Sequence, residues 1–390
     1  MMKMKKSRLA LIIIGVVLSV LLLLGISLYF FFEYSDLALI SKSDYEKAAE
    51  LVEKYEKLYN IQETIDDRSL WDVDTDDHME DLYKAAVEAV DDKYSYYMTA
   101  EEYEEWENLV TGTFTGVGIA FSQNTDGSFV VNRVMEGGPA ELGGMKAGDV
   151  ILKVDGKVYD DSNEMAGAIR GEEGTSVEIT YARKNREKTV SLVRAEVKEL
   201  SVYADMLEDD YGYMQITSFE EETAKQFETE LKNLENKGAK GVVIDLRNNP
   251  GGMMDQSIKI ADMLLPEAMI TYTEDRDGKK ETYNSDEHCT KLNYVLLVNE
   301  NSASAAEIIA AAIKDNEGGK LVGQTTFGKG IIQGTIDLHD GSAMSLTIMQ
   351  YFSPKGSEIH ENGVEPDYVV ELPEDAKTDK QLEKALKLLK

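Results

Sequence analysis

The stretch VVIDLRNNPGGMMD, from Val242 to Asp255, changes character twice. A continuous apolar run over Gly241 to Leu246 is typical of a buried strand, and MMDQSIKIADMLL after the turn has helical spacing. Between them, Gly251 and Gly252 permit unusual backbone angles and expose N–H groups. The turn lacks the G-x-x-x-x-G-K-[ST] pattern of a phosphate loop, so a purely structural turn and an N–H-rich site are both open.

The same alternation of strands and helices continues on both sides of this stretch. Strands are expected at Tyr211 to Ile216 and Tyr294 to Asn299, with a helix over 220–238. The chain beyond Leu200 is therefore predicted to form a layered α/β core with largely parallel strands. Ligands of such sheets gather at the turns from strand to helix.

One of these turns carries a serine, in VNENSASAAEIIAAAIKD from Val298 to Asp315. Ser304 and Glu307 match the S-x-x-E capping box, so capping of the helix is one interpretation of the serine. The alternative is a nucleophile, because the helix dipole favours developing negative charge and the N–H of Ala305 points toward it.

A candidate base lies downstream, in GQTTFGKGIIQGTIDL. Lys329 stands between two glycines, and on a strand it would share a face with Ile331 and Gln333. It has no nearby acid in the sequence and lies among Gly, Phe and Ile, so burial is expected to lower its pKa and make it a usable base. The four histidines lie in no G-x-S-x-G or chymotrypsin-like context: His78, His288, His339 and His360.

Residues 111–198 have a different composition, with short alternating strands separated by Gly and Asp turns and one helix at Ser162 to Ile169. The stretch resembles a PDZ domain, through the loop Gly116-Val117-Gly118-Ile119 and the later GGMKAGDVILKVDG. Exposed N–H groups in such a loop can hold a C-terminal carboxylate while the next strand edge pairs with an extended peptide. The alternative is that the two glycines only shape a turn. The strands are expected at Phe129 to Val134, Val150 to Val154, Val177 to Tyr181 and Thr189 to Val193.

The N-terminus contains an uncharged run from Leu9 to Phe32. As a helix it would be about 36 Å long, enough to cross a hydrocarbon core of roughly 30 Å. Lysines precede it and Glu33 follows it, which places the N-terminus in the cytoplasm and the remaining chain outside, at the cell membrane. A cleavable signal peptide is the alternative, although no A-x-A-like site follows. Beyond it, the stretch from Ser43 to Trp106 is predicted to be helical.

Composition excludes several classes of protein. The 390 residues carry a formal net charge of -32, which argues against nucleic acid or anionic lipid as the main partner. Cys289 is the only cysteine, so no internal disulfide can form. No cluster of residues has the spacing of a metal site, and no metal or other cofactor is expected.

Taken together, these motifs resemble the C-terminal processing peptidases, or tail-specific proteases, which are Ser-Lys serine peptidases with an inserted PDZ domain. The resemblance runs from about Leu82 to Asp375 and includes YSYYMTAEEY, DLRNNPGG, VNENSASAAEI, GKGIIQ and YFSPKGSEIHENGVEPD. It implies a crotonase-like α/β core. It also implies the following roles: Ser304 as nucleophile, Lys329 as base at the family's spacing (329 − 304 = 25), Gln333 to orient the lysine, and Ala305 with Gly251 and Gly252 as oxyanion donors. Ala306 departs from the serine that many members have there.

The resemblance further implies protein substrates with exposed C-terminal tails and a PDZ domain that gates the site. Arg170 is a candidate link between the two, with an ordinary surface arginine as the alternative. The N- and C-terminal helices would form a homodimer or simply cover the core. A catalytically silent PDZ scaffold and a crotonase-like binder of lipid or acyl ligands are the competing functions. The expected division is 1–8 cytoplasmic tail, 9–32 transmembrane anchor, 33–110 helical region, 111–198 PDZ domain, 199–376 peptidase core and 377–390 C-terminal helix.

Overall fold

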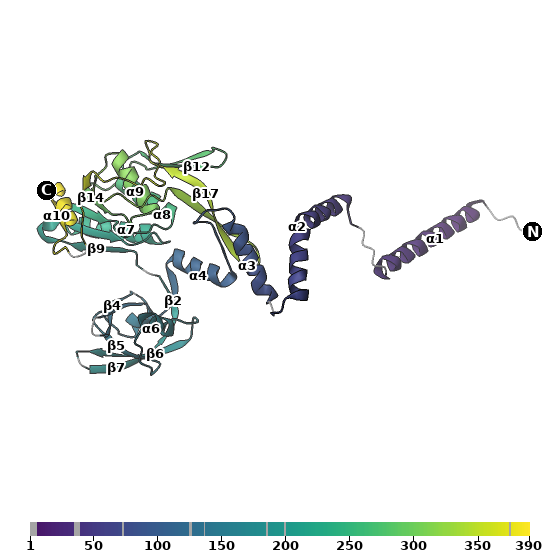
Figure 1. The fold of residues 1–390 in the computed structure, drawn as a ribbon, viewed down its shortest axis with the longest axis horizontal. Helices are drawn as coiled ribbons and strands as arrows, with labels where there is room; N and C mark the ends of the chain where they lie inside the picture. The colour runs from purple at the N-terminus through teal and green to yellow at the C-terminus, as the bar shows by residue number, and fades with distance from the viewer. Residues whose placement is uncertain are drawn as a thin grey trace, which may run out of the picture. The chain divides into compact units, whose positions relative to one another are not determined.

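The structure, a computed structural model, describes residues 6–34, 40–71, 74–124, 127–135, 137–184, 186–198, 200–373 and 376–390. The chain divides into two compact units, Met1–Met79 and Glu80–Lys390, and Figure 1 shows the elements of each. Most of the expected cytoplasmic tail, residues 1–5, lies outside the described residues.

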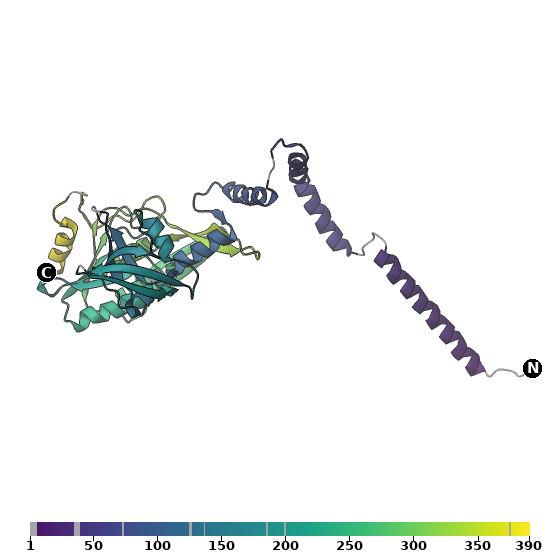
Figure 2. The same cartoon turned by 90° about the horizontal axis from the view of Figure 1, so that it is seen from below.

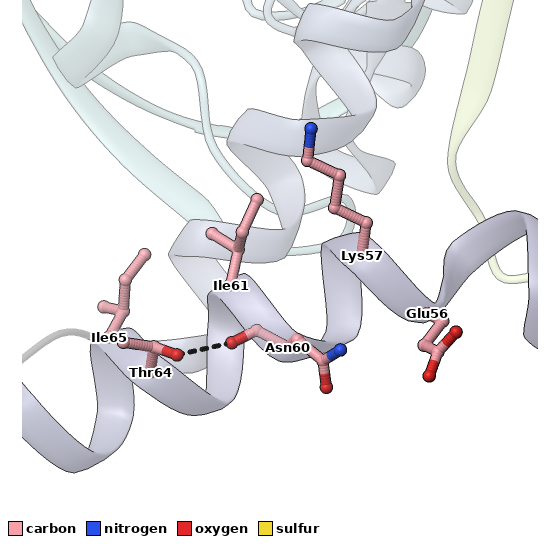
Figure 3. A pocket seen from close by; sticks show the side chains of 6 residues that line it. All are labelled: Glu56, Lys57, Asn60, Ile61, Thr64 and Ile65. Atoms are coloured by element: carbon pink, nitrogen blue, oxygen red, sulfur yellow. Dashed lines mark hydrogen bonds between the residues drawn. The ribbon is translucent and has the colours of Figure 1, made fainter.

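The first unit contains two long helices. Helix α1 (Lys6–Tyr34) includes the stretch Ile13–Phe31, with a mean hydropathy of 2.7, which is long and apolar enough to cross a membrane. A signal sequence near the N-terminus would meet the same criteria of length and composition. Helix α2 (Lys42–Arg68) is capped by Ser41 and has no buried residue. Figure 3 shows a shallow hollow on it, where Lys57, Ile61 and Ile65 project to one side.

The region expected to be helical up to Trp106 is interrupted by a strand. Helix α3 (Thr75–Glu88) ends before Asp91, whose positive φ of 58° turns the chain. Strand β1 (Tyr96–Met98) follows, and helix α4 (Ala100–Thr111) begins with a capping box between Thr99 and Glu102. The helical expectation was wrong here, since the aromatic run of β1 pairs with a distant strand instead of continuing the helix.

The stretch that resembles a PDZ domain folds as one body. Its two ends meet where β2 (Thr113–Gly116) pairs antiparallel with β8 (Ala195–Lys198). Between them, an antiparallel sheet in the order β3-β4-β5-β6-β7 surrounds α6 (Ser162–Ile169), as Figure 1 shows. All four expected strands and the helix are present. The remaining elements are β3 (Ile119–Gln123), β4 (Phe129–Val134), α5 (Pro139–Leu142), β5 (Val150–Val154), β6 (Ser176–Arg183) and β7 (Arg186–Val193).

The core contains the parallel sheet that the sequence predicts. Its order is β18-β15-β14-β11-β10-β9, and only the β9–β10 pair is antiparallel. The strands are β9 (Val202–Met206), β10 (Gly212–Ile216), β11 (Gly241–Asp245), β14 (Asn293–Val298), β15 (Lys320–Gly323) and β18 (Tyr368–Val369), with a short η1 (Glu208–Asp210) before β10.

Alternate residues of the central strands face different helices, because successive side chains of a strand point to opposite faces. Val242 and Ile244 belong to the main core with α7 (Thr223–Asn236), α8 (Met254–Leu264) and α9 (Ala305–Asp315). Val243 packs on the other face against Ala385 of α10 (Lys380–Leu389). Figure 2 shows α10, in yellow, lying along the core. The apolar face of this C-terminal helix is thus occupied within the chain.

A second sheet, which the sequence did not predict, is built around β17 (Ala343–Phe352). This strand pairs antiparallel with β1, with β12 (Met269–Asp275) and with β16 (Ile331–Asp337), and β13 (Lys280–Asn284) pairs with β12. Strand β16 begins two residues after Lys329, and its register shifts between Ile332 and Gln333. The simple alternation expected for 329–333 was therefore wrong.

Candidate active site

Ser304 stands at the turn between β14 and α9 in a strained conformation. Its φ of 53° and ψ of −115° are unusual for a residue with a side chain, and such strain concentrates at functional sites. Its N–H donates to Oε2 of Glu307 at 2.9 Å, and the N–H of Glu307 donates to the carbonyl oxygen of Ser304 at 2.8 Å. The carboxylate of the expected capping box is thus in place, and it fixes the main chain of the serine.

The Gly251-Gly252 turn packs directly behind this serine. A Cβ added to Gly251 would lie 2.7 Å from Cβ of Ser304 and 2.8 Å from the carbonyl oxygen of Ala303, so a side chain has no room there. Its φ of 101° also favours glycine. The N–H of Gly251 already donates to Oδ1 of Asn249 at 2.8 Å. Of the two glycines, Gly252 is the one that lines the cavity in front of Ser304.

Lys329 lines the same cavity as Ser304. Its N–H donates to Oε2 of Glu307 at 2.8 Å, and its carbonyl oxygen accepts the hydroxyl of Tyr351 at 2.6 Å. The side chain is half-buried, and its Nζ lies 4.7 Å from the centroid of the Tyr94 ring. Burial lowers the pKa of Lys329 below its ordinary value, and the negative charge of Asp92 opposes part of this shift.

Glu307 joins the two segments and is completely buried. Besides the N–H groups of Ser304 and Lys329, its carboxylate accepts the hydroxyl of Thr326 at 2.5 Å and the N–H of Gly328 at 2.7 Å. One carboxylate therefore receives four hydrogen bonds, which compensate for its removal from water. Sequence reasoning assigned Glu307 only to the helix cap and missed its bonds to the lysine segment.

A cavity of about 400 Å³ brings most of the predicted residues together. Ser304, Ala305, Gly252, Lys329 and Gln333 all line it. In the part of the chain that the structure describes, no hydrogen bond joins Oγ of Ser304 to Nζ of Lys329. Gln333 was expected to orient the lysine, but its amide donates to Oγ1 of Thr347 at 3.0 Å. The rest of the lining is largely apolar or aromatic, including Trp106, Met253, Met254, Ile308, Ile331 and Ile332.

The residues expected to bind a peptide line a second cavity, of about 300 Å³. Gly118 has a φ of 75°, which bends the loop between β2 and β3. Val117 and Ile119 also bury their side chains in the core beside α6, so they stabilise the fold as well as the groove. The first residues of α6 and Arg170, which follows its last residue, lie across the groove from the loop.

Arg170 also lines a third cavity, of about 800 Å³, which adjoins both others. This cavity shares Phe114 and Arg170 with the peptide groove, and it shares Tyr96 and Trp106 with the cavity in front of Ser304. The guanidinium of Arg170 lies 6.0 Å from the centroid of the Phe114 ring. The third cavity therefore shares lining residues with each of the two predicted sites, and Arg170 lines it together with the peptide groove.

Among the described residues, no group of three or more His, Cys, Asp and Glu side chains is arranged to hold a metal ion. Two residues near Lys329 were not predicted to belong to the site. Asp92 and Tyr94 come from the loop before β1, and of the two only Tyr94 lies in a quoted motif of the resemblance, YSYYMTAEEY.

Comparison with known proteins gives a consistent result. Residues 210–370 match the family model described as peptidase family S41, and residues 115–193 match the PDZ domain model. The carboxy-terminal processing protease CtpA of Bacillus subtilis is 36% identical over 329 residues, which make up 83% of this chain and 70% of the relative. The carboxyl-terminal-processing protease of Synechocystis is 35% identical over 308 residues, covering 75% of this chain and 72% of the relative. Among solved structures, the photosystem II D1 C-terminal processing protease has a TM-score of 0.50 at 29% identity, covering 85% of this chain and 90% of that one.

Proposed function

The chain belongs to peptidase family S41 and is a serine peptidase of the carboxy-terminal processing type with a PDZ domain, and from this premise we propose that Ser304 and Lys329 form its catalytic dyad. The observation that carries the proposal is their shared cavity. A strained serine at the start of α9 and a half-buried lysine with a lowered pKa both line it. Both backbones are held by the carboxylate of Glu307.

In the proposed mechanism, the neutral amine of Lys329 takes the proton of the Ser304 hydroxyl while its oxygen attacks the scissile carbonyl carbon. The N–H groups of Ala305 and Gly252 stabilise the resulting oxyanion, since the N–H of Gly251 is bonded to Asn249. The C–N bond then breaks, and the Lys329 ammonium gives its proton to the leaving amine. Water hydrolyses the acyl-enzyme in the same way, with Lys329 again accepting and returning the proton. Gln333 reaches the lysine once its amide leaves Thr347.

We further propose that the loop Gly116–Ile119 binds the carboxylate of a substrate tail, and that Arg170 couples the groove to the core. PDZ-mediated recognition of peptide substrates is typical of this kind of protease. The adjoining cavities support the coupling, because a bound tail would alter the surroundings of Arg170 and Phe114 first. The proposed domain limits are 111–198 for the PDZ domain and 199–376 for a crotonase-like core.

The location that fits α1 best is a single membrane anchor with the catalytic unit outside the cytoplasm. Its apolar stretch Ile13–Phe31 supports this, and the basic residues before it favour an inward N-terminus. N-terminal sequencing of the mature protein, with alkaline extraction of membranes, tests the proposal. An intact N-terminus in the membrane fraction supports the anchor, whereas a chain that begins beyond residue 34 indicates a cleaved signal sequence.

The catalytic assignment is tested by incubating the full chain, in detergent, with an unstructured protein that has an apolar C-terminal tail. Ser304→Ala and Lys329→Ala should each abolish cleavage while folding is retained, and Lys291→Ala, an exposed lysine, should cleave normally. If all variants and the parent cleave equally, the dyad is wrong. If none cleaves even with added tail peptide, the alternative of a catalytically silent PDZ scaffold is favoured.

We also propose a homodimer through the exposed apolar side chains of α2, which include Leu51, Val52 and Tyr55. Sedimentation of the full chain at several concentrations, beside Leu51→Glu, tests it. Loss of a dimer in the variant would support the stripe as the interface.

A further inference from the structure

The surroundings of Lys329 are completed by a segment that lies before the PDZ domain. The loop Asp92–Ser95 precedes β1, which pairs with β17 at Ser345, and it is outside the residues that match the peptidase family model. Nζ of Lys329 lies over the ring of Tyr94, from this loop, at 4.7 Å from its centroid. The backbone of Lys329 is held by Glu307 and Tyr351, so it is the long side chain that needs support from elsewhere.

Asp92 is held by hydrogen bonds within the loop that carries Tyr94. Its carboxylate accepts the hydroxyl of Ser95 at 2.6 Å and the N–H of Tyr94 at 3.1 Å. Ser95 is buried and its hydroxyl oxygen accepts the N–H of Thr347 at 3.0 Å, which attaches the loop to β17. Thr347 in turn accepts the amide of Gln333. A chain of hydrogen bonds therefore connects Asp92 to Gln333, which lines the cavity.

Asp92 is ionised over the pH range in which Lys329 would act as a base. Burial alone would raise the pKa of Asp92, but hydrogen bonds from Ser95, Thr347 and the N–H of Tyr94, together with the charge of His360, hold it below its ordinary value. Its negative charge raises the pKa of Lys329, whereas burial lowers it. The fixed carboxylate thus favours the ammonium form, whereas burial favours the neutral amine.

The other ionisable groups near Lys329 come from four elements. Lys93 lies 4.8 Å from the Tyr94 ring centroid and 5.9 Å from that of Phe327, and it lines the same cavity. Glu307 of α9 and Tyr351 of β17 bond the lysine main chain. The main chain of His360 packs against Gly330, and its Nδ1 is buried without a hydrogen bond among the described residues. The charge that acts on the lysine side chain is that of Asp92, and not that of any of these groups.

We propose that Asp92 and Tyr94 are positioning residues for Lys329: the carboxylate and the ring hold its amine in the cavity and set the pH range of activity. The proposal rests on the proposed function, because it requires Lys329 to be the base. The ring shields the amine from water, which lowers the pKa of Lys329. The carboxylate limits this decrease, so that enough of the lysine can hold the proton that the leaving amine must receive. The loop Asp92–Ser95, which lies before the PDZ domain in the sequence, then supports the proposed base.

The test is the pH dependence of kcat/KM for the full chain in detergent, with a peptide that carries an apolar tail. Asp92→Asn removes the charge, so the acid limb should move to lower pH by about half a unit to one unit. Tyr94→Ala admits water, so the acid limb should move to higher pH. Tyr94→Phe keeps the ring and should restore the parent profile. Asp91→Asn, the same change at the exposed neighbouring residue, should leave the limb in place.

The outcomes separate this proposal from the dyad itself. If Asp92→Asn and Asp91→Asn give the same profile as the parent, or if Asp92→Asn moves the limb upward, Asp92 does not set the pH range and the proposal is overturned. If Lys329→Ala is as active as the parent, the proposed base is wrong instead. Tyr94→Ala removes a large side chain and can impair folding. The proposal is therefore judged on the pH profile of the near-isosteric variant Asp92→Asn.

Discussion

The two sheets of the core differ in how they are assembled, and each carries one half of the candidate dyad. The parallel sheet is formed by strands and helices that follow one another along the chain, and its β14–α9 turn holds Ser304. The antiparallel sheet joins β1 to β17 and contains β16, which begins two residues after Lys329, and the loop with Tyr94 leads into β1. The serine is therefore placed by local connections, whereas the lysine depends on contacts between distant segments.

Because the two halves come from different sheets, the hydrogen bonds between the sheets determine whether Ser304 and Lys329 are aligned. Glu307, in the helix that begins at Ser304, accepts the N–H of Lys329, and Tyr351 of β17 donates its hydroxyl to the carbonyl oxygens of both Ser304 and Lys329. Variants at these links test whether the two halves of the site are one unit.

The largest effect is expected for Glu307→Ala, which breaks the link outright. It would leave four donors without their acceptor, two of them buried and two partly buried, so the free energy of unfolding should fall by about 3 to 5 kcal/mol. Chemical denaturation of the full chain in detergent measures this change. Glu300→Ala, an exposed acid in the same region, is the control. A loss below about 1 kcal/mol would mean that water replaces the carboxylate and that the sheets are held together by other contacts.

Gly251→Ala should damage the serine half alone. The added methyl group would meet Cβ of Ser304 at 2.7 Å, which displaces the nucleophile and should lower kcat about 100-fold, with a smaller effect on stability. Gly278→Ala is a matched control, because Gly278 also has a positive φ, 76°, but its nearest neighbour would lie 3.7 Å away. If Gly251→Ala is as active as Gly278→Ala, the added methyl group does not displace Ser304 and the prediction is wrong.

The lowered pKa of Lys329 should be visible in the pH dependence of kcat/KM of the parent protein. The proposed base, Lys329, must be neutral to accept a proton and burial lowers its pKa, so kcat/KM should rise with pH and level off below the pKa of an exposed lysine, about 10.4. Rate measurements from pH 5 to pH 11 test this expectation. A limb that still rises steeply near pH 10 would indicate an exposed lysine and contradict the half-buried position.

The smallest effect is expected for Tyr351→Phe, which removes one hydroxyl between the halves. The loss of hydrogen bonds to the carbonyl oxygens of Ser304 and Lys329 should cost about 1 to 2 kcal/mol of stability and a few-fold in kcat. Tyr272→Phe, on the neighbouring β12, serves as the control. If activity is unchanged while stability falls, the hydroxyl contributes to the fold but not to the alignment of the dyad.

The sequence predicted the parallel sheet and the PDZ body well because their signals are local. Buried strands such as β11 and the helices after them are readable from apolar runs, turns and helical spacing within one stretch. Ser304 and Lys329 were found because a strand-to-helix turn and a lysine between glycines are also local patterns. The structure places both residues at one cavity.

The antiparallel sheet and the surroundings of the lysine left no comparable signal. Lys329 has no acid near it in sequence, yet Asp92 approaches it in space because β1 pairs with β17. The bonds from Glu307 to Gly328 and Lys329 span 21 and 22 residues and have no periodic pattern. Pairing between distant strands depends on the whole fold, so no reading of a single stretch could predict it.

The pairing of β1 with β17 also bears on when the enzyme first becomes active. Tyr96 pairs with Ser345, which lies 345 − 96 = 249 residues later, with the complete PDZ body between them. During synthesis the PDZ body can fold as soon as its own strands have emerged, because a domain generally folds as a unit. The loop Asp92–Ser95 reaches the lysine only after β17 has been made, so a nascent chain would recognise tails before it could cut them.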